Sequence, residues 1–291
     1  MIIFNYLLYY LILIPISLLP FPVLYLLSDF TSFILFHIVG YRKKVVMDNL
    51  RNSFPEKSVK EIKQIARKFY RHFSDIIVES IKLFTISSVE LRKRQFLTNP
   101  ELPQRLFDEK KSLMLVTGHI GNWEWAGTVT PFFVPYRSMV IYQKLSNRFF
   151  NKKIMNTRGR FGLDLVRTKN VKSYFETHKD ELIMVVSVSD QSPSSANRSY
   201  WTTFLNQPTA VQIGAERNAR QSNMAVVYAD IKKIKRGYYE TTLQLLFENA
   251  GQTKVGEITE KFTRIIEEKI REKPEYWLWS HRRWKLKKPI N

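Results

Sequence analysis

The chain has 291 residues, of which 44% are hydrophobic and 14% aromatic, so a packed core is available and extensive disorder is excluded. It carries 46 Lys and Arg against 26 Asp and Glu, a formal net charge of +20, and it contains no cysteine. The lack of cysteine excludes disulfides, zinc–thiolate sites and cysteine nucleophiles. The charge predicts an anionic partner, such as nucleic acid, an anionic membrane surface or an acidic protein.

The first 40 residues are apolar and predict a membrane anchor. No charged side chain precedes Asp29, and the run Ile2–Leu27 exceeds the roughly 20 apolar residues that cross a bilayer. Prolines at positions 15, 20 and 22 interrupt this run, which leaves both a kinked span and an in-and-out hairpin open. A buried core helix is the alternative, whereas a cleaved signal peptide is disfavoured because the amino end lacks Lys and Arg.

A basic stretch follows the anchor and sets its orientation. It consists of Arg42, Lys43, Lys44, Arg51, Lys57, Lys60 and Lys63. Because basic residues flank the cytoplasmic side of a membrane segment, we predict an inner-membrane anchor at residues 1–40. Residues 41–291 then form a single domain on the cytoplasmic face, which begins with a basic connector at residues 41–55.

The domain is predicted to be α/β. Ser58 and Glu61 have the spacing of a capping box, and apolar residues then recur every three or four positions as far as Phe84, which predicts a long amphipathic helix. From Leu113 onward, short apolar runs alternate with helical patterns, which is typical of a central, largely buried sheet flanked by helices. The expected strands are 113–117, 139–142, 163–167, 182–188, 224–229 and 239–246. The expected helices are 123–130, 147–158, 171–178, 209–220 and a last one at 258–270.

The run Leu113–Glu124 reads as a buried strand, a glycine-containing turn and the start of a helix. The turn carries His119, and Glu124 follows five positions later. The two can meet if His119 lies in the turn and Glu124 in the first helical turn, with Asn122 as the N-cap. A histidine oriented by a carboxylate is a general base at neutral pH, although a structural histidine fits this short pattern equally well.

The remaining histidines are scattered and show no metal-ligand spacing, so neither a metal nor a cofactor is expected. The last residues, from Pro274 to Pro289, interleave three tryptophans with five cations. Such a segment suits a membrane interface or single-stranded nucleic acid, and buried tryptophan packing is an equally good explanation.

Several motifs resemble those of one family when they are taken together. They are Gly118-His119-x-Gly121-Asn122-Trp123-Glu124, then Asp190-Gln191 followed by Thr203-Phe204-Leu205 and Pro208-Thr209, then Trp277-x-Trp279-x-His281-Arg282-Arg283-Trp284-Lys285, and the connector Tyr41–Arg51 with Phe54-Pro55. In this order, behind an apolar amino end, the set closely resembles the late acyltransferases of lipid A biosynthesis. That family belongs to the wider acyltransferase superfamily with a His-x4-Asp/Glu motif.

The resemblance implies a membrane-bound enzyme that moves a fatty acyl group from acyl carrier protein to a hydroxyl of a lipid A precursor, without a nucleic-acid partner. By this match His119 is the base and Glu124 orients it, while the other residues expected at the substrate are Gly121, Asn122, Arg158, Arg160, Asp190 and Arg282. Two alternatives stay open. One is the same chemistry on another lipid acceptor, such as an aminolipid, a glycolipid or a lysophospholipid, and the other is a membrane-tethered, non-catalytic binder of anionic ligands.

Overall fold

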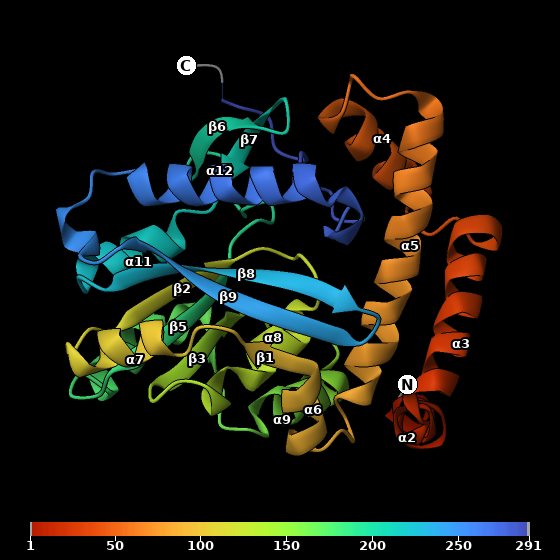
Figure 1. Cartoon of the computed structure of the whole chain (residues 1–291), viewed down its shortest axis with the longest axis horizontal. Coiled ribbons are helices and arrows are strands. Elements are labelled where there is room, and N and C mark those ends of the chain that lie inside the picture. Colours follow the sequence, from red (N-terminus) through yellow and green to blue (C-terminus); the bar gives the residue numbers. More distant parts are fainter. Residues whose placement is uncertain (1, 290–291) are drawn as a thin grey trace.

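The computed structural model describes residues 2–289. Residue 1 of the predicted anchor (1–40) and residues 290 and 291 of the predicted domain (41–291) lie outside the described residues. A seven-stranded sheet in the order β1-β9-β8-β2-β5-β3-β4 forms the centre of the molecule (Figure 1). Neighbouring strands are parallel except for the antiparallel pair β8 and β9. The strands are β1 (Gln95–Leu97), β2 (Leu113–Thr117), β3 (Arg137–Tyr142), β4 (Asp164–Arg167), β5 (Ile183–Val188), β8 (Ala225–Lys235) and β9 (Tyr238–Phe247).

Helices cover both faces of this sheet, which confirms the predicted α/β class. In Figure 1, α11 (Gly214–Gln221) and α12 (Glu257–Glu272) lie above the strands. The helices below them are α6 (Ser88–Arg94), α7 (Glu101–Asp108), α8 (Trp123–Val129) and α9 (Arg148–Gly159). The short α10 (Val171–Thr177) packs against β4. The sheet is therefore buried on both sides, as expected for strands that read as nearly continuous apolar runs.

The long helix α5 (Val59–Lys82) stands at one end of the sheet, and its predicted capping box is present. The Ser58 hydroxyl accepts from the backbone N–H of Glu61, and the Glu61 carboxylate accepts from the backbone N–H of Ser58. The connector expected at residues 41–55 is wrong in one respect, because it folds into α4 (Lys43–Ser53), which buries Val46 and Leu50. Its apolar residues fall on one face of a helix, a pattern that the many cations obscure.

The segment expected to be a helix at 209–220 is also corrected. Its first residues form β7 (Gln207–Val211), which pairs with β6 (Tyr200–Phe204) in a separate two-stranded sheet next to α12, and only the second part forms α11. Leu205 and Asn206 have positive φ angles of 49° and 64°, so the connecting turn is a tight two-residue hairpin. The apolar–polar alternation of residues 207–211 is too short to distinguish a strand from a helix, so the pairing of β7 with β6 determines its structure.

The amino-terminal segment is helical and apolar, as predicted. It consists of α1 (Ile2–Leu7), a π-helical stretch (Leu8–Leu13) and α2 (Ile14–Leu18), then a break, then α3 (Phe21–Phe33) and a second π-helical stretch (Ile34–Ile38). By length and composition, the helix Phe21–Ile38 is long and apolar enough to cross a membrane. The division into an anchor at 1–40 and a catalytic domain at 41–291 stays a prediction.

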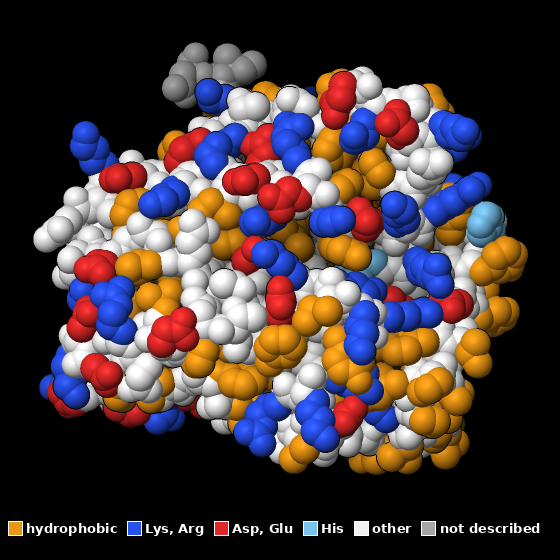
Figure 2. Space-filling model, in the orientation of Figure 1, with side chains coloured by type: hydrophobic (Ala, Val, Ile, Leu, Met, Phe, Trp, Pro, Cys, Tyr) orange, Lys and Arg blue, Asp and Glu red, His pale blue; other side chains and the backbone are white. Residues whose placement is uncertain are grey.

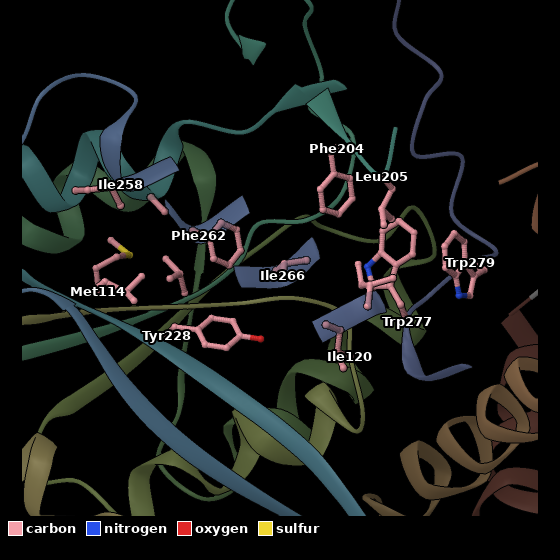
Figure 3. Close-up of a cluster of buried hydrophobic side chains, with 14 of the residues drawn as sticks. Met114, Ile120, Phe204, Leu205, Tyr228, Ile258, Phe262, Ile266, Trp277 and Trp279 are labelled. Carbon is pink, nitrogen blue, oxygen red and sulfur yellow. The ribbon is translucent and has the colours of Figure 1, made fainter. Parts of the chain in front are cut away.

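The carboxyl-terminal tryptophans are core residues, so the packing explanation of this segment is the one the structure supports. Trp277 is 3% exposed and Trp279 is fully buried. Figure 3 shows both indole rings beside Phe204 and Leu205 of the β6–β7 hairpin, with Ile266 of α12 next to them. The cluster joins the end of the chain to the turn that follows β2, which carries His119.

Candidate active site

Two neighbouring parallel strands bring the site together. β2 ends at Thr117, which lies opposite Val188, the last residue of β5. His119 follows Thr117 by two residues, and Asp190 follows Val188 by two residues. Because the carboxyl ends of parallel strands open at the same edge of a sheet, the two side chains meet there.

His119 and Asp190 form a closely bonded pair. The distance from His119 Nδ1 to Asp190 Oδ1 is 2.5 Å, and Asp190 Oδ2 accepts from the His119 backbone N–H at 2.8 Å and from Trp277 Nε1–H at 2.7 Å. Burial alone would raise the pKa of Asp190, but the facing His119 and these hydrogen bonds lower it to about 2. An ionised carboxylate only accepts hydrogen bonds, so the neutral tautomer of His119 that fits this pair has its proton on Nδ1 and its lone pair on Nε2.

That lone pair faces Gln191. The Gln191 side-chain nitrogen lies 3.0 Å from His119 Nε2, and the Trp123 indole stands edge-on to the imidazole with ring centroids 5.2 Å apart. The Gln191 amide therefore donates to Nε2, the ring nitrogen whose lone pair is free in this tautomer.

Glu124 was predicted to orient His119, but the structure does not bring the two side chains together, and the carboxylate that contacts the imidazole is that of Asp190. The Glu124 carboxylate forms a two-pronged ion pair with Arg158 on α9, at 2.9 Å to Nε and 2.6 Å to Nη2. Asn122 is the N-cap of α8, as predicted, with its side-chain oxygen accepting from the Trp125 N–H at 2.9 Å. Glu124 thus lies in the first turn of α8, where it pairs with α9 rather than with the turn before the helix.

A second buried carboxylate supports this turn from behind. Glu79 on α5 is 1% exposed and accepts hydrogen bonds from Asn122 Nδ2, from the Tyr239 hydroxyl and from the Tyr25 hydroxyl, at 2.7, 2.8 and 2.9 Å. Burial and the neighbouring Asp75 raise the pKa of Glu79 to about 7, against the opposing hydrogen bonds. The Asn122 side chain therefore links the start of α8 to α5.

The end of the chain closes over the same turn. Ile120 forms a β-bridge with Trp277, and the backbone N–H of Leu278 donates to the His119 carbonyl at 3.2 Å. The backbone of Gly118 packs closely against two neighbours, since a Cβ there would lie 2.7 Å from Ile266 Cδ1 and 3.2 Å from Asp190 Oδ2. These contacts fix the backbone on both sides of His119.

His119 and the Glu124–Arg158 pair line an open cleft of about 1000 Å³. Part of its wall is apolar and comes from Leu115, Ala126, Val140, Ile141 and Val186. Its lining also includes the cationic side chains of Lys169, Lys172, Arg217 and Lys285. The cleft therefore combines an apolar surface, a basic surface and a histidine held by a carboxylate.

Comparison with known proteins identifies the family. The family described as bacterial lipid A biosynthesis acyltransferase matches residues 1–286, which is nearly the whole chain. The chain belongs to this family. It is 23% identical over 273 residues to the lipid A biosynthesis palmitoleoyltransferase of Escherichia coli K12, which covers 92% of this chain and 87% of the relative. A lipid A biosynthesis acyltransferase of Shigella flexneri matches with the same identity and coverage.

This lipid A acyltransferase family member is an enzyme, as the motifs predicted, but only some of the residues expected at the substrate line its cleft. Arg158 does. Asp190 lies behind His119, and Asn122 is fully buried with its side chain bonded to Glu79. Neither side chain is part of the cleft lining, so the structure does not place Asp190 or Asn122 where the substrate-binding prediction put them.

The three other residues expected at the substrate are also outside the cleft lining. Gly121 has a φ of +62°, and a Cβ there would lie 3.0 Å from Ile231 Cγ2, so it serves the backbone turn. Arg160 donates to the carbonyls of Phe84 and Ile86. Arg282 is exposed to solvent.

The acyltransferase cleft also contains residues to which the sequence assigned no role. His281 lines it and accepts from the Ser192 N–H at 3.1 Å, and burial lowers the pKa of His281 to about 4, so its ring is neutral at pH 7. Gln191 stands directly after Asp190 in one of the quoted motifs. Both residues belong to motifs quoted above, so their place in those motifs was the only sequence signal that could have assigned them to the site.

Proposed function

We propose that this acyltransferase moves a fatty acyl group from the thioester of acyl carrier protein to a hydroxyl of a lipid A precursor. The observation that carries the proposal is the His119–Asp190 pair at the cleft, with His119 Nε2 next to Gln191, which also lines the cleft. Family membership supports acyl transfer in lipid A biosynthesis, and the donor and the catalytic roles are the steps added here.

The proposed reaction uses His119 as a general base. Its Nε2 takes the proton of the acceptor hydroxyl as the oxygen attacks the thioester carbonyl. The tetrahedral intermediate then expels the carrier thiolate, which receives that proton, and leaves an ester and a free thiol. Asp190 holds the reactive tautomer and stabilises the imidazolium, a role similar to that of the acid in a catalytic triad. General-base help of this kind is worth roughly 10²–10⁴-fold in rate.

The cations of the cleft support an acceptor that carries phosphate. Within residues 2–289, the side chains of Lys169, Arg217 and Lys285 have no ion-pair partner, whereas Arg158 is neutralised by Glu124. Unpaired cations attract phosphate groups, and a lipid A precursor is a phosphorylated disaccharide. The net charge of +20 also suits docking of an acidic carrier protein and location at the cytoplasmic face of the inner membrane.

A transfer assay tests this function. Membranes containing the wild-type enzyme, labelled acyl–acyl carrier protein and a tetra-acylated lipid A precursor should produce a labelled, more highly acylated lipid. We expect His119→Ala to reduce transfer by roughly 10²–10⁴-fold, because it removes the base. His178→Ala is the matched control, since His178 lies outside the cleft lining and bonds the Tyr174 carbonyl.

The outcomes separate the alternatives. If the wild type hydrolyses the donor slowly in a His119-dependent way but does not acylate the precursor, the chemistry stands and the acceptor is another lipid. Transfer that survives His119→Ala would overturn the mechanism.

A further inference from the structure

The amino-terminal helices present their apolar side outward. On α3, the exposed residues recur at helical spacing and are Val23, Leu26, Phe30 and Phe33, with exposed fractions of 42%, 70%, 62% and 53%. Ile3, Leu11 and Leu18 are similarly exposed on the helices before it. Figure 2 shows hydrophobic side chains gathered along the right-hand edge of the molecule, over α2 and α3. An apolar surface of this extent predicts contact with lipid or protein.

The opposite side of α3 is docked and carries polar groups beside the buried Leu24. Ser28 donates to Asp75 of α5 at 2.8 Å, and Asp29 forms an ion pair with Arg236 of the β8–β9 hairpin at 2.8 Å. The Tyr25 hydroxyl reaches Glu79. A helix on the surface of a soluble protein turns its polar side outward, whereas α3 turns an apolar side outward and its polar groups toward the body.

The helices before α3 are docked as well, on other parts of the body. The Lys153 ammonium of α9 donates to the Tyr10 hydroxyl at 2.8 Å, and the rings of Tyr6 and Phe149 have centroids 4.6 Å apart. Thr85, just beyond α5, donates to the carbonyl of Ser17 at 2.6 Å. Both halves of the segment therefore depend on the catalytic body for their polar contacts.

These contacts are incompatible with a helix that crosses the bilayer. If α3 spanned the membrane while docked, α5 would enter with it, and Arg71, whose side chain is 67% exposed, would stand in the hydrocarbon beside Asp29. If α3 left the body to cross the bilayer, it would carry Asp29 into the hydrocarbon without its partners Arg236 and Arg71. Charged groups are rarely tolerated in the membrane interior without partners.

We propose that residues 2–39 do not cross the bilayer but embed their apolar side in one leaflet, with both ends on the same side of the membrane. A basic stripe beside α3 points to an anionic leaflet. Lys63, Arg67 and Arg71 follow one another at four-residue spacing on α5, and all three are exposed. Amphipathic helices with such a basic border bind anionic lipid surfaces in the interfacial plane.

The arrangement also places the membrane beside the cleft. α9 begins next to the embedded helices, where Asn147, its N-cap, bonds the Asn5 side chain at 3.3 Å, and its last turn carries Arg158, which lines the cleft. A lipid acceptor then reaches His119 along α9 without leaving its leaflet. The topology does not depend on which lipid is acylated, so the topology and transfer experiments fail separately.

The absence of cysteine makes the test direct. Single variants Ile3→Cys, Leu18→Cys and Val39→Cys are treated with a membrane-impermeant thiol reagent in spheroplasts with an intact inner membrane. We expect no labelling of any of them from outside, and labelling of all three after detergent, with a periplasmic cysteine protein as the positive control. Labelling of Ile3→Cys alone from outside would show a single span. Labelling of Leu18→Cys alone would show a hairpin that crosses twice, and either result overturns the proposal.

A crosslinking experiment gives the positive counterpart. Phe36, in the helix after α3, and Tyr70 of α5 have ring centroids 5.3 Å apart. In native membranes, Phe36→Cys/Tyr70→Cys should be joined by a short bifunctional maleimide into a species of altered gel mobility. The control pair Phe33→Cys/Tyr70→Cys should not, because Phe33 is on the exposed side of the helix. Failure of the first pair in folded, active enzyme would show that α3 leaves the body in the membrane.

A vesicle-binding experiment tests whether an anionic lipid surface is what contacts the apolar side of the amino-terminal helices. The double variant Lys63→Glu/Arg67→Glu should co-float several-fold less with vesicles of phosphatidylglycerol and phosphatidylethanolamine. Lys179→Glu/Lys254→Glu has the same net charge and lies away from α3, so it should bind like the wild type. Equal loss in both variants would indicate a general charge effect, and no loss in either would exclude the basic stripe as a lipid contact.

Discussion

Asp190 and Glu79 are both buried carboxylates on opposite sides of the same turn, yet their protonation differs. Asp190 is 5% exposed and Glu79 is 1% exposed. The pKa of Asp190 is lowered to about 2, whereas that of Glu79 is raised to about 7. Burial raises the pKa of each, so burial does not explain the difference.

The difference comes from what surrounds each carboxylate. Asp190 faces the imidazole of His119 and accepts three N–H hydrogen bonds, all of which favour the charged form. Glu79 accepts from neutral hydroxyl and amide donors and lies near the carboxylate of Asp75, which disfavours a second negative charge. Asp190 is therefore suited to hold a charge next to a base, and Glu79 to hold a turn in place.

Removing the charge of Asp190 should have the largest effect on activity. In Asp190→Asn the residue no longer fixes the proton on Nδ1 of His119 or stabilises the imidazolium, so kcat should fall by roughly 10³–10⁴-fold. The transfer assay measures this, and a thermal unfolding curve in detergent checks that the variant is folded. A folded variant with more than a tenth of wild-type kcat would show that Asp190 does not orient the base.

Replacing Glu79 by a residue that does not titrate should change how the stability of the protein depends on pH. Its pKa is about 7 in the folded state and roughly 4.3 in the unfolded chain, so the folded state binds the extra proton between these values. Wild-type stability relative to Glu79→Gln should therefore fall as pH rises from about 4.5 to 7, by roughly 3 kcal/mol, and then level off.

Parallel thermal unfolding of the wild type and Glu79→Gln over this pH range gives the difference curve. Glu176→Gln, at an exposed glutamate of α10, is the matched control for the loss of a surface carboxylate. A constant difference for Glu79→Gln would mean that Glu79 is ionised throughout.

Removing one hydrogen bond to Asp190 should have the smallest effect. Trp277→Phe keeps most of the packing but loses the Nε1–H donor, which should cost about 1 kcal/mol and reduce kcat roughly fivefold. Trp279→Phe is the matched comparison, because its Nε1–H donates to the Pro274 carbonyl and not to Asp190. Equal activity losses in the two variants would indicate that only core packing is affected.

The sequence predicted the elements around the site better than the contacts within it. The strand Leu113–Thr117, the N-cap Asn122 and the helix from Val59 follow from local patterns, and the structure confirms them. The partner of His119 does not follow from a local pattern, because a short spacing such as His-x4-Glu carries no information about a carboxylate 71 residues away. The two strands that deliver the pair were predicted, but their adjacency depends on sheet order.

The basic and aromatic carboxyl-terminal segment shows a second limit. Its composition fits a membrane or nucleic-acid surface, yet Trp277 and Trp279 are buried and Arg283 donates to the Ala210 carbonyl. Composition gives the kinds of side chain in the segment but does not say which of them become buried when the segment folds back onto the domain. The roles of such residues follow only from tertiary contacts.

The register between β2 and β5 makes the active site sensitive to loop length. His119 and Asp190 each stand two residues past the paired ends Thr117 and Val188, so their meeting depends on an equal count of residues in two unrelated turns. One residue inserted after either strand would leave both strands intact and still separate the pair. Insertions should therefore be tolerated in the turn between α10 and β5, at the opposite ends of these strands, but not after Thr117 or Val188.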